Sequence, residues 1–89
     1  MTMQMHYLTY IDYPDLGLGA GDPCGFDQAC DEYADARQNG YHATVMRIDP
    51  PSGSQCGFVH DVTPDADECI RRRYRQRAAY DMPEWLEAV

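Results

Sequence analysis

The chain has 89 residues, of which 44% are hydrophobic and 25% are charged, so we expect one globular domain over residues 1–89 rather than a disordered chain. Fifteen acidic residues stand against seven arginines and no lysine, which gives a net charge of −8. The apolar runs are too short to cross a membrane and the first residues lack the basic head of a secretory signal, so we expect a cytoplasmic protein.

Residues 3–13 alternate aromatic, β-branched and other side chains with a period of two, which predicts a strand. Both faces of this strand are partly apolar, so we expect it inside a sheet rather than at an edge. Residues 14–23 contain Gly17, Gly19 and Gly21 between this strand and a helix, as a phosphate-binding loop would. The spacing is not G-x-G-x-x-G and no lysine is present, so a flexible connector is favoured over a nucleotide site.

Residues 26–39 are expected to form an amphipathic helix, because their apolar and acidic side chains separate onto opposite arcs at a helical period. Asp22 can cap the start of this helix, and Pro23 is tolerated in a first turn. Gly40 predicts its end, since glycine readily adopts the left-handed conformation that terminates helices.

The apolar run at residues 42–49 predicts a second strand, and the alternating residues 56–62 predict a third. The Pro-Pro-Ser-Gly-Ser sequence at residues 50–54 is typical of a turn, so these two strands are expected to pair as a hairpin.

A second helix is expected from Thr63 to about residue 79, with the Thr63 hydroxyl as its cap and Pro64 in its first turn. Residues 83–89 can form a short helix beginning at Pro83 or a last strand, and the helix is favoured.

The expected order is therefore strand, helix, strand, strand, helix and tail. A right-handed crossover would make the first two strands parallel, and both helices could then cover one face of a mixed or antiparallel three-stranded sheet. The fold class predicted is α+β, a two-layer sandwich. A strand at the tail would convert it to the ferredoxin-like variant.

The sequence contains no strong signature of catalysis or metal binding. Cys56 and His60 share one face of a predicted strand, and Cys24, Cys30, His42 and Cys69 could supply further metal ligands, but no pair has tight zinc-site spacing. Reduced core thiols are therefore favoured over metal ligands or disulfides. We expect neither an enzyme nor a bound cofactor.

Acidic residues concentrate in the first three quarters of the chain, where residues 1–68 hold twelve acids and two arginines. On the first helix, Asp27, Asp31 and Asp35 are expected to form one exposed row with a spacing of ~6 Å. Such a row can imitate a series of phosphates and attract a basic surface, although every amphipathic helix has a solvated polar face. The candidate partner-binding residues are Asp22, Asp27, Asp31, Glu32 and Asp35.

The basic residues concentrate at the other end, in residues 71–77. Acids four residues earlier, Asp67 before Arg71 and Glu68 before Arg72, are expected to pair with part of this cluster. The arginines also point all round the helix, so direct nucleic-acid binding is less favoured than an intramolecular or solvated role. The secondary candidate patch comprises Arg71, Arg72, Arg75 and Trp85.

Small size, the acidic row and the strand–helix–hairpin–helix order resemble the acidic single-domain proteins that phages make against host defence, the anti-CRISPR proteins in particular. The resemblance implies binding to a basic ribonucleoprotein or protein partner in the host cytoplasm, without cofactor, membrane or catalysis. We therefore expect a small acidic inhibitor. The alternatives are a homodimeric α+β domain, paired through an uncovered sheet face, and a nucleic-acid-binding module that uses residues 71–77.

Overall fold

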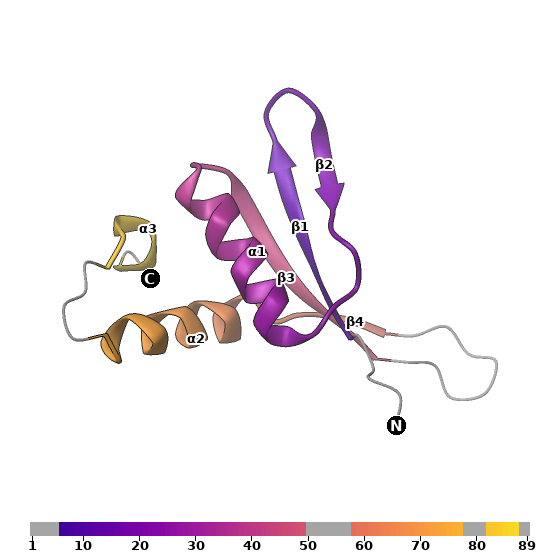
Figure 1. Cartoon of the computed structure of the whole chain (residues 1–89). Coiled ribbons are helices and arrows are strands. Elements are labelled where there is room, and N and C mark those ends of the chain that lie inside the picture. Colours follow the sequence, from indigo (N-terminus) through magenta and orange to yellow (C-terminus); the bar gives the residue numbers. More distant parts are fainter. Residues whose placement is uncertain (1–5, 50–57, 78–81, 88–89) are drawn as a thin grey trace.

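The computed structural model describes residues 6–49, 58–77 and 82–87, and in these ranges the chain forms a four-stranded antiparallel sheet with helices packed on one side (Figure 1). The strand order is β2-β1-β3-β4. The elements are β1 (Tyr7–Tyr13), β2 (Gly17–Ala20), α1 (Phe26–Gln38), β3 (His42–Asp49), β4 (Phe58–Asp61), α2 (Thr63–Arg75) and α3 (Glu84–Glu87). The predicted α+β fold is confirmed.

Helix α1 covers β1 and β3, and α2 crosses beside it against β3 (Figure 1). The buried face of α1 contains small residues such as Ala29 and Ala36, which let the helix lie close to the sheet. Thr9 of β1 is fully buried, and its hydroxyl donates a 2.9 Å hydrogen bond to the Ala29 carbonyl. Val45 of β3 is also fully buried in this core.

The expected connector at residues 14–23 is wrong, because residues 17–20 form the edge strand β2. The chain reverses at residues 14–16, and Gly17 follows with a φ of 82°, a conformation that glycine adopts without strain. Leu18 is 70% exposed, so β2 lacks the buried alternating face that identifies a strand in a sequence. Its place in the sheet depends on backbone pairing with β1.

The expected parallel pairing of the first two predicted strands is also wrong, because β1 and β3 pair antiparallel. The unrecognised strand β2 explains the error. Strands β2 and β3 each run antiparallel to β1, so they are parallel to each other with β1 between them. Helix α1 therefore connects two parallel strands, as the crossover rule requires, but they are not neighbours. The predicted interior position of the first strand is confirmed.

Helix α1 begins at Phe26 and ends before Gly40, both as predicted, but its N-terminal cap differs from the expected one. Gly40 has a φ of 85°, and the Tyr41 amide donates a 3.0 Å bond back to the Ala36 carbonyl, which satisfies an end-of-helix acceptor. The N-cap is Gly25 rather than Asp22. Asp22 is therefore not used as a cap and stays exposed.

Helix α2 starts at Thr63, but the predicted hydroxyl cap does not form. The Thr63 hydroxyl instead donates a 2.6 Å bond to Asp61 Oδ1 and accepts a 3.1 Å bond from the Val45 amide. This side chain thus joins the start of α2 to the sheet at β3.

The tail adopts the favoured helical alternative. Residues 84–87 form α3, and Leu86 is fully buried against the core, so the strand that a ferredoxin-like variant requires does not form there. Helix α2 ends at Arg75, with Gln76 as its C-cap, so it stops before the expected end near residue 79. The predicted turn at residues 50–54, Cys56 and residues 78–79 lie outside the described residues. The described helices include none long and apolar enough to cross a membrane.

Candidate functional site

Asp27, Asp31 and Asp35 of α1 are all exposed, as expected, but they do not share one flank of the helix, because Asp35 lines a groove on the side away from α2. On the flank facing α2, Arg73 Nη1 lies 2.6 Å from Asp31 Oδ1, and Arg73 Nη2 lies 3.6 Å from Asp27 Oδ1. The Asp27 and Asp31 side chains are 89% and 68% exposed, yet one guanidinium of the same chain partly neutralises both. Two of the three members of the expected exposed row, Asp27 and Asp31, therefore have a cationic partner within the chain.

The other flank of α1 faces the β1–β2 hairpin across a groove of about 300 Å³, which we call the hairpin groove. Its walls are Ile11, Tyr13, Gly19, Ala20, Gly21, Glu32 and Asp35. Within the described residues, no arginine lies within ion-pair distance of Glu32 or Asp35. The groove therefore brings two uncompensated acids together beside an aromatic ring.

Glu32 is the least satisfied acid in the described part of the chain. Its Oε1 atom is buried without a hydrogen-bond partner, and a Cβ added at Gly21 would lie 2.9 Å from it. Burial raises the pKa of the neighbouring Cys24 thiol, and the charges of Glu32 and exposed Asp22 raise it further. Asp22 and Glu32 thus act on the same point, and a desolvated carboxylate oxygen of this kind is stabilised by a cation. Glu32 and Asp35 line the groove, and Asp22 lies outside its lining but acts on the same Cys24 thiol as Glu32, so we call these three residues the groove acids.

The arginines of α2 are largely occupied within the protein, although not by the expected partners. Arg71 and Arg75 both bind Glu68, at 3.0 and 2.8 Å, and hold the pKa of that carboxyl below its usual value, with Arg75 contributing more. Arg71 Nε also donates to the Leu86 carbonyl at 3.4 Å. Arg72 is exposed, and the expected Glu68–Arg72 pair is absent from the described ion pairs.

The expected Asp67–Arg71 pair is replaced by a buried contact between the helices. The Tyr33 hydroxyl donates a 2.6 Å hydrogen bond to Asp67 Oδ1, joining α1 to α2. Burial and this bond raise the pKa of Tyr33 well above its usual value, so the hydroxyl keeps its proton at neutral pH. Trp85 stacks edge-on against Tyr33 at 5.8 Å and lies 5.3 Å from Arg37 Cζ, so its ring packs on the core.

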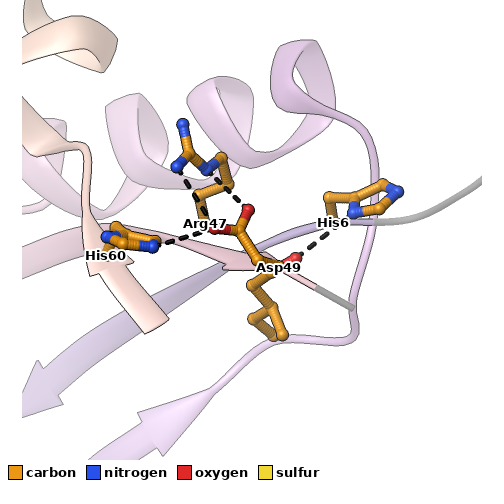
Figure 2. Close-up of polar contacts among 5 residues, drawn as sticks. His6, Arg47, Asp49 and His60 are labelled. Atoms are coloured by element: carbon orange, nitrogen blue, oxygen red, sulfur yellow. Dashed lines mark hydrogen bonds and ion pairs between the residues drawn. The ribbon is translucent and has the colours of Figure 1, made fainter. Parts of the chain in front are cut away.

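A polar cluster lies where β3 and β4 pair beyond the helices (Figure 2). Arg47 Nε and His60 Nε2 lie 3.0 and 2.9 Å from the Asp49 carboxylate, and they lower the pKa of that carboxyl, with Arg47 contributing more. His6 Nδ1 lies 3.2 Å from the Ile48 carbonyl oxygen nearby. The paired side chains are 40–47% exposed, so this cluster is a solvated ion-pair network at the sheet edge.

Three of the candidate metal-ligating cysteines lie in the described part of the chain as free thiols. Cys24 and Cys30 are buried and Cys69 is half-buried. Burial raises the pKa of Cys30 to about 12, and Cys69 adds to the effect through its charge and as the acceptor of the hydrogen bond that the Cys30 thiol donates. In residues 6–49, 58–77 and 82–87, no three histidine, cysteine or acidic side chains converge as a metal site would require.

Sequence reasoning missed a second hollow, a cavity of about 520 Å³ on the α2 side of α1, which we call the interhelix cavity. It is lined by Tyr33, Arg37, Thr44, Thr63, Asp67, Arg71 and neighbouring residues. Arg37 gave no signal in the sequence beyond its position in the last turn of an amphipathic helix.

Comparisons of this chain with models of known families, with curated proteins and with solved structures found no match.

Proposed function

We propose that this chain is a small acidic binding protein that engages a basic, nucleic-acid-handling partner and blocks it, as its resemblance to anti-CRISPR proteins implies. The single observation that carries the proposal is the buried Glu32 Oε1 atom, which lacks a hydrogen-bond partner and lines the hairpin groove beside Asp35. The protein would act in the cytoplasm, that of the host cell if a phage encodes it.

The groove acids are the part of the acidic surface best suited to a cationic partner. Asp27 and Asp31 already share Arg73, so a partner would compete with an internal guanidinium to reach them. A partner can reach Glu32 and Asp35 without displacing an internal guanidinium. The Tyr13 ring beside them can pack against the aliphatic part of a long basic side chain. We therefore propose that a lysine or arginine side chain of the partner enters the hairpin groove.

Net charge supports the same choice of partner. A chain with a net charge of −8 repels nucleic acid and attracts basic proteins over a distance set by the salt concentration. Three arginines of α2 are already paired within the chain and are unavailable to phosphates. Two of them bind Glu68, and Arg73 binds Asp27 and Asp31. Occupying a basic surface built for nucleic acid would be sufficient to inhibit the partner.

Affinity capture from a bacterial lysate with the immobilised protein tests the proposal. We expect basic nucleic-acid-binding proteins to be captured at low salt, and duplex DNA or RNA to compete with the capture. The triple variant Asp22→Asn, Glu32→Gln, Asp35→Asn should lose at least about tenfold in affinity, because removing one member of a desolvated charge pair costs about 2–5 kcal/mol.

The matched control is Asp27→Asn with Asp31→Asn, which removes two acids from the same helix but from the flank that Arg73 already occupies. This variant should retain most of the captured partner. Equal capture by wild type and by the groove-acid triple variant would refute the proposal, as would captured proteins that nucleic acid fails to displace.

A glycine substitution tests the groove without changing charge. In Gly21→Ala the new methyl group would lie 2.9 Å from Glu32 Oε1, so the Glu32 side chain must move. We expect weaker capture with an unchanged far-UV circular dichroism spectrum. Unchanged capture would show that the position of the Glu32 carboxylate is irrelevant to binding.

A homodimer is the second candidate, because the sheet face opposite the helices carries exposed apolar side chains. Leu18 on β2 and Val59 on β4 are 70% and 53% exposed. Analytical ultracentrifugation of the wild type and of a Leu18→Ser, Val59→Ser double variant measures the oligomeric state and tests this candidate. A wild-type dimer that becomes monomeric in the variant supports it, and a wild-type monomer at high concentration excludes it.

A further inference from the structure

The interhelix cavity lies where the carboxyl-terminal half of α1 and the start of α2 meet the first residues of β3. Strand β4 pairs only with residues 46–49 of β3, so the cavity occupies the side of β3 that β4 leaves open. Its volume of about 520 Å³ falls in the range of small-molecule sites. Ala43, Pro64 and the Tyr33 ring give it apolar walls.

Arg37 supplies a positive charge to this cavity that no acid of the described chain neutralises. Its Nε atom is buried without a hydrogen-bond partner, and the described ion pairs do not include it. The guanidinium is held by stacking on Trp85, 5.3 Å from the ring centre. The unpaired Nε–H group of Arg37 can donate to a carboxylate, and a guanidinium can bind a carboxylate through two parallel hydrogen bonds.

Asp67 supplies an acceptor to the same cavity. Tyr33 donates to its Oδ1 atom, and the described residues provide no donor to its Oδ2 atom. Asp61 also lines the cavity, with one carboxylate oxygen bound by Thr63. The lining also contains Arg71, but its guanidinium is bound to Glu68, so Arg37 faces two acids, Asp61 and Asp67. This balance disfavours a phosphate dianion, whereas a monoanion that also carries a hydrogen-bond donor complements both Arg37 and Asp67.

We propose that the interhelix cavity binds a small aromatic carboxylate bearing a hydroxyl group, with its carboxylate on Arg37, its ring against Tyr33 and its hydroxyl donated to Asp67. This site lies on the opposite flank of α1 from the groove acids, so it does not rest on the proposed inhibitor function. Each can fail without the other.

Titration of the full chain with 4-hydroxybenzoate tests the proposal, using the fluorescence of Trp85 and the NMR shifts of Tyr33 and His42. Trp85 is the single tryptophan of the chain and packs on both Arg37 and Tyr33, so it reports directly on the cavity. We expect saturable binding in the roughly millimolar range or tighter for a ligand of this size. Benzoate, which lacks the hydroxyl, and methyl 4-hydroxybenzoate, which lacks the charge, should each bind at least about fivefold more weakly, a loss of about 1 kcal/mol.

Arg37→Gln should weaken 4-hydroxybenzoate binding at least about tenfold, the cost of losing a charge-assisted pair. Arg72→Gln is the matched control because Arg72 is exposed and lies outside this cavity lining, and it should bind like the wild type. Equal affinity for the acid and its methyl ester would overturn the proposal even if Arg37→Gln failed to fold. Absence of a saturable response in wild type at about 10 mM, weaker than any useful small-molecule site, would also overturn it.

Discussion

Removing one hydroxyl group from the interface between α1 and α2 gives a direct test of how the two helices are held together. In Tyr33→Phe the ring and its contact with Trp85 are kept, and the 2.6 Å hydrogen bond to Asp67 is lost. Tyr33 is 3% exposed and Asp67 is 8% exposed, so the bond lies in a largely desolvated environment. The buried Asp67 carboxylate would then lack its interhelix partner.

A hydrogen bond to a charged group contributes about 1.5–3 kcal/mol to stability, so we expect Tyr33→Phe to lower the free energy of unfolding by about 2 kcal/mol. For a domain of this size that loss corresponds to a fall in Tm of roughly 8–16 °C. Urea unfolding followed by far-UV circular dichroism measures the change, and an unaltered m-value would show that the same surface is exposed on unfolding.

Tyr10→Phe is the matched control, because Tyr10 is a half-buried tyrosine of β1 on the opposite sheet face from α1. It should change stability by less than about 0.5 kcal/mol. A double-mutant cycle with Asp67→Asn isolates the pair itself, since a direct interaction makes the two effects non-additive. If Tyr33→Phe matched the control, or if its effect simply added to that of Asp67→Asn, the bond would not stabilise the helix packing.

Three further predictions concern the tail, the surface charges and the thiols. Leu86→Ala should cost about 2–5 kcal/mol in chemical denaturation, because a fully buried side chain leaves a cavity, and a cost under about 1 kcal/mol would mean that α3 does not dock. Arg73→Gln should cost at most about 1 kcal/mol, since Asp27 and Asp31 are largely exposed, and a larger loss in the same assay would contradict the surface character of these pairs. Burial raises the pKa of Cys30 from 9.0 to about 12, so this thiol ionises at lower pH in the unfolded chain than in the folded one. The free energy of unfolding should therefore fall as pH rises from about 9 toward 12. Unfolding curves at alkaline pH should show a shallower loss in Cys30→Ala, and parallel curves for wild type and variant would contradict this.

Elements with a buried periodic face could be predicted from the sequence. Helix α1 separates apolar from acidic residues and stops just before Gly40, and the bounds of β3 follow its apolar run. Strand β2 could not be predicted in this way, because its Leu18 side chain faces solvent and its stability comes from hydrogen bonds to β1. Missing one strand was enough to reverse the predicted direction of another.

The candidate site was predictable in composition but not in pairing. The sequence identifies the acids of α1, but Arg73 reaches Asp31 from 42 residues away, a distance at which local spacing carries no information. Adjacent positions also diverge in role, because successive residues on a helix point about 100° apart. Asp31 therefore meets α2 while Glu32 lines the hairpin groove.

Glu32 and Arg37 place two unsatisfied atoms of opposite charge on a single helix. Five residues separate them, which corresponds to a rise of about 7.5 Å and a rotation of about 140° around the axis. They consequently open into different hollows, one toward the hairpin and one toward α2. Because a helix of 13 residues moves as a rigid body, a displacement of α1 would change the shape of the hairpin groove and of the interhelix cavity together. A substitution of Glu32 or Arg37 alone would leave the other side chain in place.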